Sequence, residues 1–437
     1  MAIFYPKILI VGNEPFNMKS GGGITMTNLF KGWEKDNIAV AVEKTDNTDF
    51  TICEKYYQLG FQECKQRFPF NLLQHDSKIK SGHAAEIKRR LPDDKNSLSK
   101  SSRLQIIYLS ILQYTGIIHY KNKFVISNEL LNWIDDFSPD VIYSMLSSME
   151  LIRFVIDLNK KTNVPVAIHI MDDWPTTISS NQISPLKYYW KYRVDKEFRK
   201  LISKSKYLLS ISEAMSDEYY RRYGFYFQPF HNPIDIKFWS AYSRSDYERN
   251  EVFTILYAGR IGTGLKKCLL DLAKAINNLV MRGYNIEFRI QSTTNSPILN
   301  ELIRYAFVKL NEVAPYNELP KIFSKADLLL LPNDFDRKSV RFLKYSMPTK
   351  ASEYMVSGSP ILVYSSLESA VTKHALKYNW AYVVSDNSTV KLEKAIIELY
   401  ENPELRKRLG NTARSFAISN YDDSIVRDQF RKYLISD

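Results

Sequence analysis

The sequence contains very little cysteine, with Cys53, Cys64 and Cys268 as the only three in 437 residues. An odd number without C-x-x-C spacing does not fit a disulfide framework, and it provides no zinc-binding pattern. A small secreted protein held together by disulfides is therefore excluded. We predict that the three thiols are reduced and buried.

The N-terminal residues lack the pattern of a signal peptide. Ile8–Val11 are apolar, but the polar residues Asn13 and Glu14 follow almost at once. A short run rich in branched side chains is typical of a buried first strand and not of a secretory leader. The predicted location is the cytoplasm.

Acidic residues are scarce relative to basic ones, since 48 Asp and Glu face 60 Lys and Arg and the formal net charge is +12. The excess is largest between Lys78 and Lys123, where ten basic residues accompany three acidic ones. Such a charge suits nucleic acid, an anionic membrane surface or phosphorylated small molecules. No RNA- or DNA-binding motif accompanies it, so we predict no nucleic-acid partner. A nucleic-acid binder explained by charge alone is the alternative.

Long uninterrupted hydrophobic runs are missing, but two segments combine apolar or aromatic residues with basic ones. Leu104–Tyr120 contains two glutamines and a histidine, so it cannot span a bilayer unaided. It fits an interfacial helix over anionic headgroups or a core helix. Leu186–Tyr207 fits contact with lipid or acceptor, or a solvated helix with one aromatic face in the core. An anionic membrane surface on the inner face of the cell membrane, contacting Lys78–Lys123 and Leu186–Tyr207, is therefore a predicted partner.

Apolar runs alternate with helical patterns along most of the chain, which predicts an α/β protein. A chain of 437 residues is too long for one ordinary core, so two domains of roughly 200 residues each are expected. We predict two successive doubly wound domains with a boundary after the HNPID segment, at residues 1–235 and from 236 onward. No internal repeat or low-complexity run is visible.

Candidate ligand-binding residues of the first half follow two predicted strands. The strand Lys7–Val11 leads into a glycine-rich loop with Gly22 and Gly23, where backbone can approach a ligand closely. The strand Val164–Ile170 contains His169 near its carboxyl end, where ligands collect in open α/β sheets. The alternatives are simple turn chemistry for the glycines and a structurally satisfied histidine.

In the second half, the predicted strand Phe253–Tyr257 is followed by a loop that combines glycines with basic residues. Arg260 follows Gly259 in this loop, and Lys266 and Lys267 come after two further glycines. Glycines let backbone approach phosphate, and an arginine with a lysine can neutralise a departing diphosphate. Alternatively, each of these cations belongs to a surface ion pair.

The segment Ser346–Tyr364 predicts a short helix opened by Pro348 and closed by Gly358, followed directly by a buried strand. Its acid Glu353 lies on one helix face with Lys350. The free N–H groups of the first helical turn suit an anionic ligand, and a nucleotide diphosphate would fit there. The alternative is a simple ion pair between Glu353 and Lys350.

Taken in order, several motifs resemble the GT-B glycosyltransferases, particularly the retaining enzymes of family 4. In the second half these are YAGRIG followed by KK, VAPYNELPKIFSKADLLLLP, PTKASEYMVSGSPILVY and NPELRKRLGNTAR. The first half contributes GGG after the first strand, an I-H-x-x-D segment, ISEAM and HNPID. The resemblance covers almost the whole chain. It implies two Rossmann-like domains facing across a cleft, the second at 236–415, and a helix within 416–437 that crosses back to the first domain.

The resemblance also implies roles for the candidate residues of the second half. Glu353 would hydrogen-bond the ribose hydroxyls of the nucleotide, and Arg260 with Lys266 would hold the donor diphosphate. Thr349 and Lys350 would lie beside the diphosphate at the start of the helix. Charge-assisted hydrogen bonds of this kind contribute roughly 1.5–3 kcal/mol each.

In the first half, the resemblance implies that Gly22 and Gly23 face the phosphates across the cleft and that His169 lies near the transferred sugar. It implies neither a metal nor a further cofactor, so Asp172 and Asp173 are not interpreted as a manganese site. Capping of the following turn is the simpler interpretation of Asp172.

Two positions depart from the family pattern. The family often has a glutamate eight residues before the ribose-binding one, where it contacts the donor sugar, and this chain has Tyr345 there. The spacing after Arg260 also differs, which leaves Lys266 and Lys267 as equal candidates for the diphosphate contact. The nucleotide half of the prediction is therefore better supported than the sugar half.

The activity that the resemblance implies is transfer of a hexose from a nucleotide-diphosphate sugar to a saccharide or lipid-linked acceptor, with retention of configuration, in bacterial cell-surface polysaccharide synthesis. Two alternatives use the same fold. A sugar-nucleotide epimerase would turn over the donor without an acceptor. A non-catalytic sugar-binding subunit would bind the donor without turnover, and Tyr345 is the residue that favours it.

Overall fold

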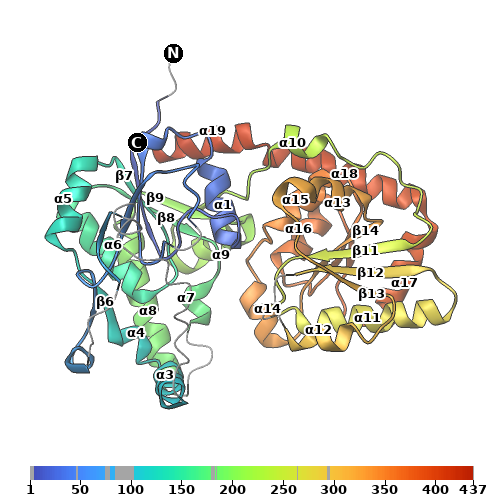
Figure 1. Cartoon of the computed structure of the whole chain (residues 1–437), viewed down its shortest axis with the longest axis horizontal. Helices are drawn as coiled ribbons and strands as arrows, with labels where there is room; N and C mark the ends of the chain where they lie inside the picture. The colour runs from blue at the N-terminus through green and yellow to red at the C-terminus, as the bar shows by residue number, and fades with distance from the viewer. Residues whose placement is uncertain are drawn as a thin grey trace. The chain divides into compact units, whose positions relative to one another are not determined.

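The structure is a computed structural model that describes residues 4–45, 48–73, 79–83, 103–178, 183, 185–262, 264–292 and 296–436. The chain forms two compact α/β units (Figure 1). Unit 1 comprises Met1–Phe230 and Gln429–Asp437, and unit 2 comprises His231–Asp428. In each unit, helices cover both faces of a largely parallel sheet (Figure 1).

Unit 1 is built on an eight-stranded sheet with the order β10-β9-β8-β7-β1-β2-β3-β5. All neighbours are parallel except β5, which runs antiparallel to β3. Every residue of β1, β2 and β8 is buried, as expected for strands covered on both faces. The strands are β1 (Ile8–Gly12), β2 (Ile38–Val42), β3 (Lys55–Gln58), β5 (Gly82–His83), β7 (Val141–Met145), β8 (Val166–Ile170), β9 (Tyr207–Ser210) and β10 (Gln228–Pro229).

The helices of unit 1 begin where the sequence supplies a capping side chain. Ser127, Ser148 and Ser212 each accept a hydrogen bond from a backbone N–H of the first turn that follows, which satisfies one of the free donors of a helix start. The helices are α1 (Gly21–Phe30), α3 (Arg103–Thr115), α4 (Ile118–Lys121), α5 (Asn128–Phe137), α6 (Met149–Thr162), α7 (Trp174–Thr177), α8 (Leu186–Ile202) and α9 (Glu213–Tyr223).

The prediction that Gly22 and Gly23 lie in a loop is wrong, because both belong to the first turn of α1. The Ser20 hydroxyl accepts from the Gly23 N–H at 3.0 Å and starts the helix there. A sequence with three consecutive glycines has low helix propensity. The cap and the burial of the rest of α1 against the sheet outweigh that cost.

The last residues of the chain pack on unit 1. The Phe430 ring lies 5.2 Å from the Phe30 ring, 6.0 Å from that of Tyr143 and 5.3 Å from that of Phe230, all in edge contacts. Phe430 is on α19 (Asp423–Leu434) and is fully buried. Such aromatic contacts add about 0.5–1.5 kcal/mol each beyond their buried area, so this end of the chain is part of the core of unit 1.

Unit 2 is built on a six-stranded parallel sheet with the order β13-β12-β11-β14-β15-β16. Along the chain, β12 and β13 are added on one side of β11, and β14, β15 and β16 are then added on its other side. The strands are β11 (Phe253–Ala258), β12 (Ile286–Gln291), β13 (Val308–Asn311), β14 (Leu328–Pro332), β15 (Ile361–Tyr364) and β16 (Tyr382–Val384). The predicted strand Phe253–Tyr257 is confirmed with one end shifted by one residue, and the strand predicted after Gly358 is confirmed as β15.

The helices of unit 2 pack their apolar faces on this sheet and form two core clusters, one on each face. They are α10 (Ile236–Ser240), α11 (Lys266–Met281), α12 (Pro297–Leu302), α13 (Leu319–Lys325), α14 (Arg337–Leu343), α15 (Lys350–Ser357), α16 (Ala370–Tyr378), α17 (Thr389–Glu401) and α18 (Pro403–Tyr421). Together with the sheet order, this arrangement confirms a doubly wound α/β unit.

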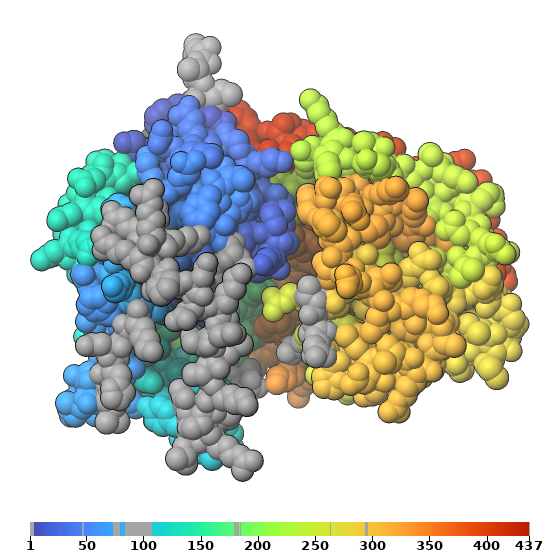
Figure 2. Space-filling view, viewed as in Figure 1, coloured from blue at the N-terminus to red at the C-terminus, as the bar shows by residue number. Residues whose placement is uncertain are grey.

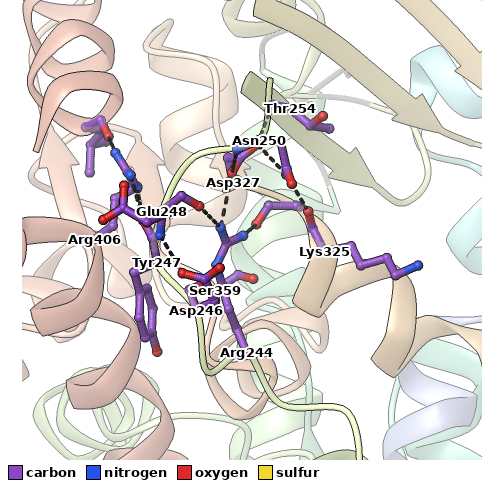
Figure 3. A network of polar contacts seen from close by, with 12 residues as sticks. Arg244, Asp246, Tyr247, Glu248, Asn250, Thr254, Lys325, Asp327, Ser359 and Arg406 are labelled. Atoms are coloured by element: carbon purple, nitrogen blue, oxygen red, sulfur yellow. Dashed lines mark hydrogen bonds and ion pairs between the residues drawn. The ribbon is translucent and has the colours of Figure 1, made fainter. Parts of the chain in front are cut away.

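A buried polar network ties the segment 241–250 to the amino ends of β11 and β14 (Figure 3). Arg244 forms an ion pair with Asp327 at 3.1 Å. Asp327, which is fully buried, also accepts hydrogen bonds from the Asn250 side chain at 2.8 Å and from the Thr254 N–H at 2.9 Å. The carboxylate therefore has donors on every side, as a buried charge requires.

A second buried arginine extends the network in Figure 3 to α18. The Arg406 guanidinium donates to the Tyr247 carbonyl at 2.6 and 2.9 Å and to the Leu399 carbonyl at 2.6 Å. Burial lowers the pKa of Arg406 from its ordinary value. The segment 241–250 is thus attached to the sheet through Arg244 and to α18 through Tyr247.

Candidate functional site

The carboxyl edge of the unit 2 sheet is the expected place for a ligand. The strand order changes direction between β11 and β14, and ligands of open α/β sheets bind outside the carboxyl ends of strands at such a point. α15 leads into β15, so its first turn lies at this same edge. The Tyr354 hydroxyl of α15 accepts from the Ala258 N–H at the end of β11 at 2.9 Å, which fixes the helix against the strand.

Lys350, the first residue of α15, reaches over the end of β11. Its Nζ lies 4.2 Å from the centroid of the Tyr257 ring, a favourable cation–π contact. Gly259 follows with a φ of +149°, and a Cβ there would lie 2.1 Å from the Lys350 Nζ. Any larger residue at Gly259 would displace the ammonium group. Gly259, the glycine of the YAGR segment, therefore leaves the space that the Lys350 ammonium group occupies.

Glu353 is a buried carboxyl on the same helix. The residue is only 6% exposed. Among the residues that the structure describes, no hydrogen bond or ion pair involves this carboxyl, so the alternative of a simple ion pair with Lys350 is not what the geometry shows. A buried acid without a donor is costly. In native proteins such an acid points to a missing partner or a function.

Burial changes the ionisation of both residues. It raises the pKa of Glu353 from its ordinary value to about 7, and the nearby Lys350 opposes this increase. Burial lowers the pKa of Lys350 to about 8, while Glu353 opposes the decrease. Both groups therefore titrate near neutral pH, and small changes in their surroundings will change their charge.

The remaining predicted cations lie at the same edge of unit 2 but are solvent-exposed. Arg260 follows β11, and its carbonyl accepts from the Tyr257 hydroxyl at 2.8 Å. Lys266 and Lys267 are the first two residues of α11 and are both exposed. The structure brings these three cations to one edge with Lys350 and Glu353, where an anionic ligand would meet positive charge.

Asp334 is a site-forming residue that the sequence analysis missed. It follows β14 and is buried, and its carboxylate accepts from the Lys266 N–H at 3.1 Å and the Cys268 N–H at 2.8 Å. It thereby caps α11, whose preceding residue Leu265 has no capping side chain. The only signal in the sequence is an acid two residues after a buried strand, and its partners lie 68 and 66 residues away.

The predicted limits of the helix between Pro348 and Gly358 are close to the observed ones. α15 begins at Lys350, with Thr349 as the residue before it, and ends at Gly358 in the left-handed conformation. Tyr345, the departure from the family pattern, is half-buried, and the Lys344 Nζ lies 5.6 Å from its ring centroid. Part of the segment that carries these residues reaches the surface of unit 2 (orange in Figure 2).

In unit 1, the corresponding carboxyl edge holds Gly22 and Gly23. The sheet of this unit changes direction between β1 and β7, and Asn13 donates to the Ser147 hydroxyl across that point at 2.6 Å. A Cβ at Gly23 would lie 2.2 Å from the Asn17 side chain, so only glycine fits. The Asn17 amide oxygen in turn accepts from the Ser20 N–H at 2.9 Å and shapes the turn before α1.

His169 is completely buried in β8, one residue before the strand end. Its Nδ1 lies 2.7 Å from the Tyr143 hydroxyl on β7. Asp173 is also buried, and it binds Arg222 through two contacts of 2.8 and 2.9 Å and accepts from the Tyr219 hydroxyl at 3.1 Å. These bonds use the Asp173 carboxylate to attach α9 to the loop after β8.

The described residues contain no group of three or more His, Cys, Asp or Glu arranged to hold a metal ion. Within the same residues, no helix has the length and apolarity to cross a membrane. The three cysteines are free thiols, and burial raises the pKa of Cys53 and Cys64 to about 12. Cys53 and Cys268 are buried as predicted, whereas Cys64 is half-buried.

The sequence matches no family model and no curated protein, but solved structures share its fold over nearly the whole chain. HepE (Alr3699) of Anabaena, in complex with UDP-glucose, is 11% identical, with a TM-score of 0.59 and coverage of 98% of this chain and 99% of HepE. Sucrose-phosphate synthase of Thermosynechococcus elongatus is 11% identical, with a TM-score of 0.61 and 97% coverage of both chains.

A third similar structure is an α,α-trehalose-phosphate synthase (UDP-forming) of Burkholderia xenovorans in complex with glucose-6-phosphate. It is 11% identical, with a TM-score of 0.60 and coverage of 98% of this chain and all of the synthase. At this level of identity the similarity establishes the architecture and not the activity. The chain therefore has the GT-B fold of these glycosyltransferases, with two Rossmann-like units.

Proposed function

We propose that the protein is a glycosyltransferase that moves a hexose from a nucleotide-diphosphate sugar to a saccharide or lipid-linked acceptor. The observation that carries this proposal is the buried carboxyl of Glu353 beside Lys350 at the carboxyl edge of unit 2, which has no hydrogen-bond or ion-pair partner among the described residues. Ribose hydroxyls would donate to the carboxylate, and a diphosphate would meet the lysine. A nucleotide diphosphate thus satisfies both groups at once.

The names of the similar structures support the same ligand class. HepE was solved with UDP-glucose, and the trehalose-phosphate synthase is described as UDP-forming. In this chain the cations Arg260, Lys266 and Lys267 surround the same edge as Lys350. We assign them to the diphosphate, with Thr349 beside it at the start of α15.

The chemical contribution of these residues is electrostatic. Cleavage of the bond between the sugar and the diphosphate leaves additional negative charge on the phosphate oxygens, and fixed positive charge stabilises that state more than the ground state. Arginine and lysine at the leaving group supply this stabilisation, so the proposed reaction uses no metal. Retention of configuration, the role of His169 beside the sugar, and phosphate contacts of Gly22 and Gly23 stay predictions from the family resemblance.

A screen of nucleotide sugars tests the proposal. The donor should raise the melting temperature of the full chain, because ligand at 100 times its Kd adds about 2.7 kcal/mol of stability. A radiolabelled donor should then lose its sugar to a saccharide or lipid-linked acceptor. Turnover of the donor without any acceptor would identify an epimerase. Binding of the donor without turnover with every acceptor tested would identify a sugar-binding subunit. In that case no role in cell-surface polysaccharide synthesis as a transferase would remain.

We expect donor affinity to depend on pH in a bell-shaped manner, with its maximum between about pH 7 and pH 8, the pKa values of Glu353 and Lys350. Below this window Glu353 is protonated and loses its charge as an acceptor. Above this window Lys350 is deprotonated and loses the positive charge that attracts the diphosphate. Calorimetry with a nucleotide sugar measures this directly, because its diphosphate lacks the terminal phosphate group that titrates near pH 6.

The variant Glu353→Gln is the control for this pH dependence. It should remove the decrease in affinity on the acidic side and keep the decrease on the basic side, which Lys350 causes. A wild-type affinity that stays constant across the window would show that neither group contacts the donor.

A further inference from the structure

Helix α3 of unit 1 exposes apolar side chains, among them Tyr108 and Leu109 as well as the three residues that follow. Ile107, Ile111 and Tyr114 recur at spacings of four and three residues and are 55%, 55% and 58% exposed, so they share one helix face. Leu112 on the other side is buried. Leu112 faces the core, but Ile107, Ile111 and Tyr114 do not, so the core-helix alternative does not describe this face of α3. Figure 1 shows α3 at one end of unit 1.

Further exposed apolar residues belong to neighbouring segments. Tyr120 at the end of α4 is exposed, and so are Phe68 and Leu72, which lie around the turn η2 (Phe70–Leu73). Arg67 connects these segments, because its guanidinium lies 5.6 Å from the Tyr120 ring centroid and its backbone N–H donates to the Lys121 carbonyl at 2.8 Å. We call this the α3 surface: Phe68, Leu72, Ile107, Ile111, Tyr114 and Tyr120.

Four cations lie on or next to the segments that form the α3 surface. The Lys121 Nζ lies 5.2 Å from the ring centroid of Tyr108 on α3. Lys65 of β4 (Cys64–Gln66) stands directly opposite Lys123 of β6 (Asn122–Phe124) in an antiparallel pair. Like charges in that position are unfavourable without a counter-charge. In the part of the chain that the structure describes, none of these three lysines or Arg67 has an ion-pair partner.

Three segments in and beside the α3 surface contain no acid. Residues 64–73, 103–128 and 185–194 include no Asp or Glu. The last of these segments begins α8, which contacts α3 because the Trp190 indole N–H donates to the Thr115 carbonyl at 2.9 Å. α8 buries Trp190 and Val194 but exposes Tyr188 and Tyr192, so one face lies in the core, as one of the two interpretations of Leu186–Tyr207 predicted. Lys78 and residues 84–102 lie outside the described residues.

We propose that the α3 surface docks on an anionic lipid bilayer. Aliphatic side chains such as Ile107, Ile111 and Leu72 gain free energy by entering the boundary between headgroups and acyl chains. Tyrosines favour that boundary because one end of the ring is apolar and the other polar. The bordering cations attract anionic headgroups. Nucleic acid would match the cations but would leave the exposed aliphatic side chains in water.

The docking does not depend on the proposed transferase activity, since the α3 surface contains none of the residues assigned to the donor. A protein that binds vesicles and transfers no sugar would refute only the proposed function. A protein that transfers sugar to a soluble acceptor and ignores vesicles would refute only the docking.

Sedimentation of the full chain with vesicles tests the proposal. Vesicles of equal parts phosphatidylcholine and phosphatidylglycerol should carry the protein down, and vesicles of phosphatidylcholine alone should not. The double variant Ile107→Ser/Ile111→Ser should weaken binding about tenfold through lost apolar burial. The double variant Arg67→Gln/Lys121→Gln should weaken it roughly 25-fold, at about fivefold for each charge.

Matched variants in unit 2 control for general changes in hydrophobicity and charge. Met281→Ser/Ile303→Ser removes two exposed apolar residues, and Lys407→Gln/Arg408→Gln removes two exposed charges. Both controls should bind like the parent chain, and thermal melts should show all four variants folded. Failure to bind anionic vesicles, equal binding to both kinds of vesicle, or equal losses in the controls would overturn the proposal.

Discussion

Replacement of Glu353 by alanine should weaken the binding of a nucleotide-diphosphate sugar by roughly 10- to 100-fold, because a hydrogen bond to a charged group contributes about 1.5–3 kcal/mol. Glu353 is buried at the carboxyl edge of unit 2, and no hydrogen bond or ion pair within the described chain competes for its carboxyl. Isothermal calorimetry measures the loss. Unchanged affinity would remove Glu353 from the donor site and leave the proposed function without its main support.

Two control variants separate binding from folding. Glu404→Ala removes an exposed acid in the first turn of α18 and should leave donor affinity unchanged. Glu353→Gln keeps the size of the side chain and removes the charge. It should weaken donor binding while the protein stays folded.

The stability of Glu353→Gln has a definite sign. Burial raises the pKa of Glu353 from 4.5 in the unfolded reference to about 7 in the folded protein, so the folded state binds the proton more tightly. The contribution to stability is therefore fully present below pH 4.5 and is lost as the pH rises through 7. Above pH 7, glutamine should give a higher melting temperature than the wild type has. A function that requires an unfavourable buried charge explains why the wild type keeps the less stable residue.

Asp327→Ala should destabilise unit 2 by about 3–5 kcal/mol, the usual effect of breaking a buried ion pair by removing one partner. The change leaves the buried Arg244 guanidinium without its carboxylate. It also leaves the Thr254 N–H at the start of β11 without an acceptor. Urea unfolding followed by circular dichroism should show an earlier transition for the part of the signal that belongs to unit 2.

Glu248→Ala is the matched control for this prediction. Glu248 is an exposed acid in the same segment, and it contacts Arg244 through its backbone carbonyl at 3.1 Å. Loss of its side chain should change stability by no more than about 0.5 kcal/mol. Equal effects of the two substitutions would show that the segment responds to any loss of acid and not to the buried ion pair.

Several features of the protein follow from the sequence alone because local interactions decide them. Short apolar runs rich in branched side chains, such as those of β1 and β11, favour buried strands covered on both faces, and the structure confirms them with ends shifted by one residue. The helix before Gly358 is likewise determined by its own residues. Its end needs a left-handed conformation that glycine adopts easily, and the structure shows it there.

The start of α1 is a feature that local interactions do not decide. Propensity places Gly21, Gly22 and Gly23 in a loop, whereas the structure has them in the first helical turn. Contacts of α1 with the sheet and the Ser20 cap supply the free energy that the local sequence lacks. The start of a helix in a glycine run therefore depends on packing with distant segments, which the local sequence does not predict.

The candidate site depended on the tertiary structure in the same way. The sequence identified Lys350 and Glu353 as neighbours on a helix, because a spacing of three residues is a local property. Only the fold shows that the ammonium lies over Tyr257, that Gly259 makes room for it, and that the carboxyl has no hydrogen-bond or ion-pair partner among the described residues. The same is true of Asp334, whose partners on α11 lie far away in the sequence. Burial and long-range contacts set the charge of these groups, and both arise only when distant segments pack together.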